Sequence, residues 1–347
     1  MKRKLVFAYP GDLNLKTGGY GYDRRLIHGL KALGWGVELR ALGDGFPSPG
    51  EKEKRRAEEV LSALEDGTLL LIDGLAFGVL DAWASKEGER LKIVGLVHHP
   101  LALETGLSAQ EQSRFKESET RALSHAKHLI VTSPGTAREL AAHYGVQAEH
   151  ITVAVPGTEP AAISTCSGDP PQILSIGTLI PRKGHDILIE ALHRVSDLAW
   201  SVTIVGSKTL HPQTANDLSE QIARLGLRER VMLAGEQNDT RALLAKADIF
   251  ALASRYEGYG MVFAEALSQG VPIVACHAGA IPDVVPEDAG FLVPVDDAEA
   301  FADALRALLS DRALLKSRAA AARRAGAMLP DWSVTAHLVS DALEAQL

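Results

Sequence analysis

Short apolar runs alternate with amphipathic stretches along almost the whole chain, and this alternation constrains the fold more than any other feature. Apolar runs without interspersed polar residues are typical of strands buried on both faces of a parallel sheet. The predicted strands are residues 5–9, 37–42, 69–73, 93–98, 129–132, 151–155, 173–176, 202–205, 231–233, 249–253, 272–275 and 291–293. Helical periodicity lies between them, as at residues 22–33, 110–125, 185–195 and 298–309.

The regular alternation of strand and helix predicts an α/β fold whose parallel sheets carry helices on both faces. About a dozen strands is roughly twice what one doubly wound sheet usually holds, so two sheets are expected. Segment 157–171 is polar and proline-rich, lacks apolar periodicity and forms the best boundary. A chain of 347 residues is long enough for two cores. We therefore predict two Rossmann-like domains, 1–160 and 161–330, and then a helical segment, 331–347.

Charge and composition exclude several classes of protein. A net charge of −8 offers no basic field to nucleic acid. Cys166 and Cys276 lie far apart in the sequence, which suits a reducing compartment better than a disulfide framework. The apolar run after the basic start stops at Pro10, too early for a secretory signal, and no run approaches a membrane span. We expect a cytoplasmic protein without a transmembrane segment; peripheral membrane contact and the oligomeric state stay open.

The loop at residues 176–185 leads from a predicted strand into a predicted helix, where open parallel sheets bind ligands. Gly177 lets the backbone approach a ligand closely. Arg182 and Lys183 place two cations at a helix start, against the helix dipole, so a negative group is expected to offset them. A diphosphate would do so. The alternative is a solvated pair of surface cations.

The loop at residues 254–267 carries two carboxylates, Glu257 and Glu265, separated by seven residues. Gly258 and Gly260 allow close backbone approach, and the amides of residues 259–262 form a helix start that suits an anion. The apolar neighbours of Glu265 predict that it is buried, and a buried carboxylate needs hydrogen-bond donors. The two hydroxyls of a ribose would supply them. A salt bridge inside the sheet is the alternative.

These two loops resemble those of the retaining GT-B glycosyltransferases of family 4, the glycogen-synthase-like group. The resemblance rests on Gly177 with Lys183 and Gly184, and on the spacing of Glu257 and Glu265. It extends over nearly the whole chain, to segments 204–206, 231–235, 247–254 and 269–275 and to Trp332. The resemblance implies that domain 1–160 binds the acceptor, that domain 161–330 binds the nucleotide sugar, and that the last helix returns to the first domain.

The resemblance also assigns roles to single residues. Lys183, helped by Arg182, would hold the donor diphosphate, and Glu265 would accept hydrogen bonds from the ribose. Glu257 and the amides after it would contact the transferred sugar and the distal phosphate. His98 would lie near the donor sugar, although whether His98 or its neighbour His99 faces it stays open. The implied catalytic residues are His98, Lys183 and Glu257, and the implied donor-binding residues are Gly19, Gly177, Arg182, Lys183, Glu257, Gly258, Tyr259, Gly260, Met261, Val262 and Glu265.

The chain contains no Asp-x-Asp pair, the usual metal-binding motif of the other large glycosyltransferase fold. The sequence therefore predicts no metal and no cofactor, and the leaving group would be stabilised by Arg182, Lys183 and helix amides. The resemblance implies a hexosyltransferase that retains anomeric configuration. A nucleotide-sugar epimerase and a non-catalytic nucleotide-sugar-binding protein stay open as alternatives. A nicotinamide-dependent oxidoreductase is disfavoured because no glycine pair completes G-x-G-x-x-G. Neither the donor sugar, its base nor the acceptor is identified.

Overall fold

A computed structural model describes residues 3–347 and divides the chain into two compact units. Unit 1 consists of the residues up to Gly157 together with Pro330–Leu347, and unit 2 is Thr158–Leu329. Each unit is built on one six-stranded sheet in which every pairing is parallel. The predicted α/β fold with two doubly wound sheets is therefore confirmed.

The sheet of unit 1 has the order β2-β1-β3-β4-β5-β6. Its strands are β1 (Lys4–Tyr9), β2 (Gly36–Ala41), β3 (Leu69–Asp73), β4 (Lys92–Val97), β5 (His128–Val131) and β6 (Ile151–Val153). Its helices are α1 (Gly18–Ala32), α2 (Glu51–Ser62), α3 (Gly74–Phe77), α4 (Asp81–Glu87), α5 (Ala109–Leu123), α6 (Pro134–His143) and α14 (Trp332–Glu344), with 3₁₀ turns at Leu101–Leu103 and Ala148–His150. Every residue of β3 is buried, as its uninterrupted apolar run predicts.

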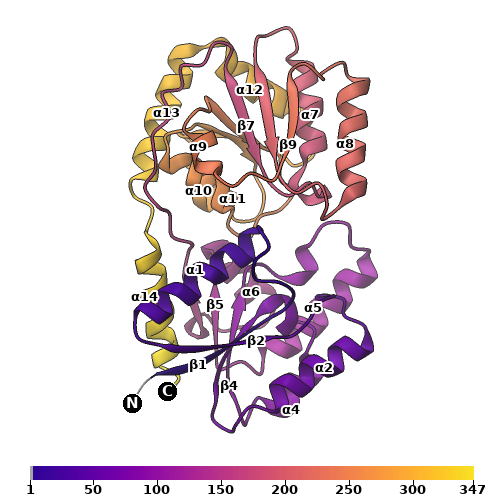
Figure 1. Cartoon of the computed structure of the whole chain (residues 1–347), viewed down its shortest axis with the longest axis vertical. Helices are drawn as coiled ribbons and strands as arrows, with labels where there is room; N and C mark the ends of the chain where they lie inside the picture. Colours follow the sequence, from indigo (N-terminus) through magenta and orange to yellow (C-terminus); the bar gives the residue numbers. More distant parts are fainter. Residues whose placement is uncertain (1–2) are drawn as a thin grey trace. The chain divides into compact units, whose positions relative to one another are not determined.

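The sheet of unit 2 has the order β12-β11-β10-β7-β8-β9. Its strands are β7 (Gln172–Ile176), β8 (Ser201–Val205), β9 (Val231–Gly235), β10 (Ile249–Leu252), β11 (Ile273–Cys276) and β12 (Gly290–Val293). Its helices are α7 (His185–Arg194), α8 (Pro212–Arg224), α9 (Thr240–Leu244), α10 (Met261–Ser268), α11 (Ile281–Val284), α12 (Ala298–Ser310) and α13 (Arg312–Gly326), with a 3₁₀ turn at Pro181–Lys183. Helix α7 packs against α8 and α12, whereas α10 packs against α9 and α13 (Figure 1).

The last helix, α14, belongs to unit 1 and packs along α1 (Figure 1). The indole Nε1 of Trp35 donates to Oγ of Ser340 at 2.9 Å. The ring of Trp332 meets the buried ring of Tyr22 edge-on, with centroids 5.6 Å apart. A helix that no strand precedes thus completes the core of unit 1. Over residues 3–347, no helix combines the length and apolar character that a membrane span requires.

The contact between α1 and α14 predicts a specific loss of stability. A Cβ added at Gly29 would lie 2.6 Å from the Cβ of Ala336, so Gly29→Ala forces the two helices apart. We expect a loss of about 1–3 kcal/mol, the usual cost of overpacking, measured by urea unfolding followed on unit 1 tryptophans.

The matched control is Gly21→Ala in the same helix, where an added Cβ has no heavy atom within 4 Å. Because alanine is the better helix former, this control should gain roughly 0.5–1 kcal/mol. Equal stability of the two variants would contradict the close helix contact.

Candidate functional site

The central strand of unit 2 marks the site. Strand β7 lies between β10 and β8. The chain continues from β7 to β8 and β9 on one side of the sheet, and then forms β10 on the other side of β7. In doubly wound sheets, ligands bind at this switch point, beyond the carboxyl ends of the strands. The two loops that follow β7 and β10 meet there, and they are the two loops that the sequence singles out.

An ion pair joins the two loops. Nζ of Lys183 donates to Oε1 of Glu257 at 2.6 Å, and Nη1 of Arg182 lies 3.4 Å from Oε2 of the same carboxylate. Nη1 of Arg182 also donates to the carbonyl of Tyr256 at 2.8 Å. Both cationic side chains are 14% exposed and that of Glu257 is 7% exposed. The cations are therefore not solvated surface charges, and the negative group facing them in the protein is Glu257.

The environment of Glu257 keeps its carboxylate ionised. Burial alone would raise the pKa of Glu257, but the charges of Lys183 and Arg182, with hydrogen bonds from Lys183 and Ser254, hold that pKa below its ordinary value. The hydroxyl of Ser254, which is fully buried, donates to Oε1 at 2.7 Å. A buried carboxylate with this many donors is a fixed negative charge at neutral pH.

Close backbone packing fixes the turn that carries the two cations. Gly184 has a φ of +61°, and a Cβ there would lie 1.9 Å from the carbonyl oxygen of Ala253. The backbone N–H of Arg255 donates to the carbonyl of Arg182 at 2.8 Å. The Arg255 side chain pairs with Asp186 and Asp296, each at 2.7 Å. Sequence reasoning missed Arg255, although its place between Ser254 and Glu257 was a signal.

A neutral histidine supports the same loop. Burial lowers the pKa of His185 to about 4, so its imidazole is uncharged at neutral pH. Its Nε2–H donates to the carbonyl of Gly177 at 3.1 Å. The stem of Lys183 passes over Gly177, where an added Cβ would lie 3.2 Å from Cδ of Lys183. Gly177 and His185 thus position the Lys183 ammonium, a role for His185 that the sequence did not suggest.

Helix α10 begins directly after the second loop. Gly260, the N-cap residue, precedes it with a φ of +87° and has no side chain that could cap the helix start. The first amides of a helix lack partners within it, so those at Met261 and Val262 point toward the loop side.

Glu265 lies in α10 and corrects one prediction. It is half-buried, whereas its apolar neighbours had predicted full burial. Glu257, in the loop, is the buried carboxylate of the pair. Burial lowers the pKa of Arg241, and the charge of Glu265 partly offsets this effect.

Unit 1 holds the two other predicted site residues, and they are neighbours. Gly19 lies in the first turn of α1, because Thr17 already caps that helix. A Cβ added at Gly19 would lie 3.6 Å from Cδ2 of His98. His98 follows β4, and its Nε2 lies 3.1 Å from Oδ1 of Asp23. His99 turns to Glu104, at 3.5 Å.

The predicted residues therefore gather in two places, one in each unit. The residues of unit 2 at the switch point are Gly177, Arg182, Lys183, Glu257, Gly258, Tyr259, Gly260, Met261, Val262 and Glu265. Gly19 and His98 lie together in unit 1.

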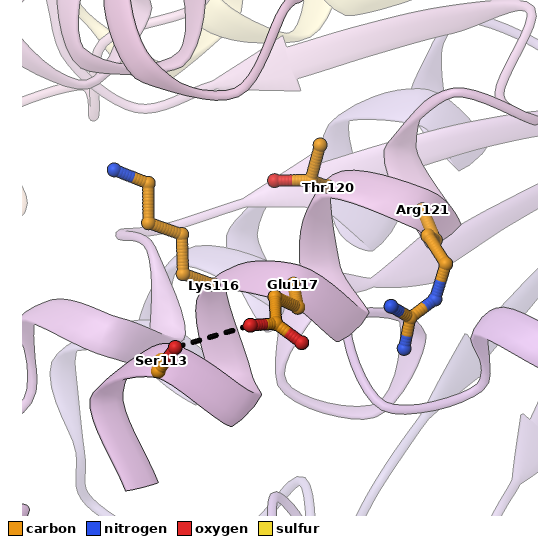
Figure 2. Close-up of a pocket in the computed structure, with 5 residues that line it drawn as sticks. All are labelled: Ser113, Lys116, Glu117, Thr120 and Arg121. Atoms are coloured by element: carbon orange, nitrogen blue, oxygen red, sulfur yellow. Dashed lines mark hydrogen bonds between the residues drawn. The ribbon is translucent and has the colours of Figure 1, made fainter. Parts of the chain in front are cut away.

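A shallow surface hollow on α5 lies apart from these residues (Figure 2). Its lining comes from one helix: Ser113, Lys116, Glu117, Thr120 and Arg121. Ser113 donates to Glu117 at 3.1 Å, and the long side chains of Lys116 and Arg121 extend from the helix in Figure 2. Mostly exposed side chains of a single helix form this hollow, and Arg121 pairs with Asp81 of α4 at 2.9 Å, so it does not have the enclosed, largely apolar form of a ligand pocket.

Two family models together match most of the chain. Residues 24–162 match the family model described as Glycosyltransferase Family 4, and residues 159–326 match the model described as Glycosyl transferases group 1. The lipopolysaccharide core biosynthesis mannosyltransferase LpsB of Rhizobium meliloti is 29% identical over 150 residues, which cover 42% of this chain and 43% of LpsB. Across four curated relatives, the matched segment spans 42% to 57% of the relative's length, so the chain matches about half of each.

Solved structures share the fold over both units. Sucrose-phosphate synthase from Thermosynechococcus elongatus superposes with a TM-score of 0.84, at 20% identity, with 99% of each chain covered. HepE from Anabaena, in complex with UDP-glucose, superposes with a TM-score of 0.76, at 21% identity, again with 99% of each chain covered. With both sheets in place and the two family models together matching residues 24–326, the chain belongs to the group 1 glycosyltransferases with the GT-B fold.

Proposed function

We propose that this chain transfers a hexose from a nucleoside-diphosphate sugar to an acceptor hydroxyl, with retention of anomeric configuration and without a metal ion. The observation that carries the proposal is the pair of partly buried cations, Arg182 and Lys183, at the switch point of unit 2. Two cations held at the start of a helix suit a diphosphate. The family, the mannosyltransferase LpsB and the UDP-glucose bound to HepE support the same donor class.

Leaving-group stabilisation is the main task of this site. As the bond from the sugar C1 to the diphosphate oxygen breaks, negative charge grows on the phosphate. Lys183 exchanges its contact with Glu257 for that phosphate, while Arg182 and the first amides of α10 add positive charge. Glu257 then retains Arg182 and Ser254 as partners and accepts hydrogen bonds from sugar hydroxyls. Once the donor is bound, these groups are in place before the bond breaks, so the chemical step itself costs little reorganisation.

Retention follows from attack on the same face that the diphosphate leaves. The acceptor oxygen forms a bond to C1 as the C1–phosphate oxygen bond breaks, and the acceptor proton passes to the departing phosphate. The step therefore needs no protein nucleophile. Glu265 serves the donor at a distance from the reaction, by accepting hydrogen bonds from the two ribose hydroxyls, and its partial exposure suits contact with a ligand.

A panel of UDP-, GDP-, ADP- and dTDP-hexoses tests the donor class. One or more of these should raise the melting temperature of the chain, because a ligand that binds only the folded state stabilises it by mass action. That donor should then support transfer to a sugar or polyol acceptor, or slow hydrolysis. If no compound in the panel raises the melting temperature, the proposal is contradicted. If the chain converts the donor into its epimer without transferring the sugar, it is an epimerase.

Lys183→Ala tests how the leaving group is stabilised. The kcat should fall by roughly 10²–10³-fold, together with kcat/KM, because the lost contact strengthens as the phosphate leaves. Wild-type activity should persist in excess EDTA. Exposed Lys246 provides the matched control, since Lys246→Ala removes a cation of the same unit that lies before β10, at the end of that strand opposite the site loop. Activity that EDTA abolishes and Mg²⁺ restores would assign the charge to a metal.

Glu265→Gln tests the ribose contact. The dissociation constant of the donor found in the panel should rise by the equivalent of about 1.5–3 kcal/mol, the usual worth of a charged hydrogen bond, in isothermal titration calorimetry. Exposed Glu220 on α8 supplies the control variant Glu220→Gln. If Glu265→Gln binds the donor as tightly as the control does, Glu265 only balances the charge of Arg241.

A further inference from the structure

Three ionisable side chains meet in unit 1 from distant parts of the sequence. Nε2 of His98 lies 3.1 Å from Oδ1 of Asp23 and 3.5 Å from Oδ2 of Asp73. Asp23 belongs to α1, Asp73 ends β3, and His98 follows β4. The sheet order β2-β1-β3-β4 brings the carboxyl ends of β3 and β4 together, next to the point where α1 leaves β1. The cluster thus occupies the switch point of unit 1.

Burial makes the charge state of this cluster decisive. Asp23 is 0% exposed and Asp73 is 3% exposed. Oδ1 of Asp73 accepts from the backbone N–H of Leu75 at 2.7 Å, whereas Oδ2 of Asp23 has no hydrogen-bond partner among residues 3–347. Two buried carboxylates side by side are costly unless a cation compensates them. In the described part of the chain, His98 is the residue that forms ion pairs with both.

We propose that Asp23 and Asp73 are positioning residues that hold the His98 side chain as an imidazolium of fixed orientation. Its Nε2–H is shared between the two carboxylates. Its Nδ1 then also carries a proton, so the ring has no acceptor nitrogen. His98 therefore donates a hydrogen bond to a ligand oxygen and does not take the acceptor proton. The hydrogen bond from His98 to a ligand oxygen rests on the proposed function. The charge of His98, in contrast, is a property of the chain without any ligand.

The surrounding groups favour this charge state. Burial alone would lower the pKa of His98, but the charges and hydrogen bonds of Asp23 and Asp73 outweigh it and raise that pKa. The pKa of Asp23 is also raised, first by burial. Tyr20 has its pKa raised to about 12 by burial and then by both aspartates, and burial likewise raises the pKa of Tyr22. Both tyrosines stay neutral, and the Tyr22 ring meets His98 edge-on at 5.4 Å.

NMR of histidine labelled with ¹³C at Cε1 tests the inference without any substrate. The His98 signal, assigned with His98→Gln, should stay at its protonated position from about pH 5.5 to about pH 8.5, where an ordinary histidine titrates. In Asp23→Asn, the midpoint should fall into this window, a shift of about one pH unit or more, since an opposite charge is lost. Asp73→Asn, which keeps an oxygen to cap Leu75, should shift it in the same direction.

The neighbouring pair supplies the control. Glu104→Gln removes the carboxylate 3.5 Å from His99 and should leave the His98 signal unchanged. Titration of wild-type His98 near 6.5, or an unchanged midpoint in both aspartate variants, would overturn the proposal. The three ligand-type atoms all lie within 4.8 Å of one another. A shift of the His98 signal by one equivalent of Zn²⁺, reversed by EDTA, would therefore assign the cluster to a cation instead.

The dependence of transfer on pH gives a second readout. Between about pH 6 and about pH 8, the transfer rate of the wild type should not change through titration of His98. The transfer rate of Asp23→Asn should change in this range, because His98 then titrates there. If Asp23 only supports the fold, Asp23→Asn should lower the activity without changing how the transfer rate depends on pH. Because the NMR result needs no activity, failure of the charge assignment and failure of the transferase proposal are distinguishable.

Discussion

The ion pair between Lys183 and Glu257 sets the arrangement of unit 2 around its switch point. It joins the loop after β7 to the loop after β10 at 2.6 Å, with both side chains largely removed from solvent. Loss of the Lys183 contact weakens the compensation of the buried Glu257 carboxylate, which then depends on Arg182 and Ser254 alone among its named partners. A rearrangement of either loop would therefore disturb this contact. A ligand that takes over Lys183 must be anionic and must also supply hydrogen-bond donors to Glu257, and a diphosphate sugar has both properties.

Each unit has a switch point in its strand order, and the side chains that gather there differ between the two units. In unit 2 the switch point lies between β7 and β10, and cations collect there. In unit 1 it lies between β1 and β3, and two carboxylates hold one histidine. Parallel strands bring their carboxyl ends to one edge, so residues that follow different strands become neighbours. The sheet order of each unit thus determines which distant residues meet.

Local pattern predicted the strands because burial on both faces leaves a continuous apolar run. The run 69–73 is strand β3 with the same bounds, and the run 93–98 is β4 shifted by a residue. Local pattern failed where position depends on tertiary contacts. Glu265 has apolar neighbours on both sides, yet on α10 it faces the partly exposed side of the helix. Glu257 is buried because Lys183, Arg182 and Ser254 surround it, and no neighbour in sequence signals this.

The partnership of Asp23, Asp73 and His98 lay beyond sequence reasoning for a similar reason. Asp73 ends β3, and its Oδ1 caps the start of α3. Its second oxygen, however, faces a histidine that follows the neighbouring strand. Asp23 lies in a helix whose periodicity gives no sign that a charged residue is fully buried. Only the strand order and the path of α1 bring these groups together.

A crystal structure of the chain with UDP, the nucleotide portion of the HepE ligand, tests the central claim most directly. We expect a phosphate oxygen within hydrogen-bond distance of Nζ of Lys183, with the α10 amides facing the same diphosphate and Glu265 against the ribose. UDP bound elsewhere, with the contact between Lys183 and Glu257 unchanged, would contradict the account.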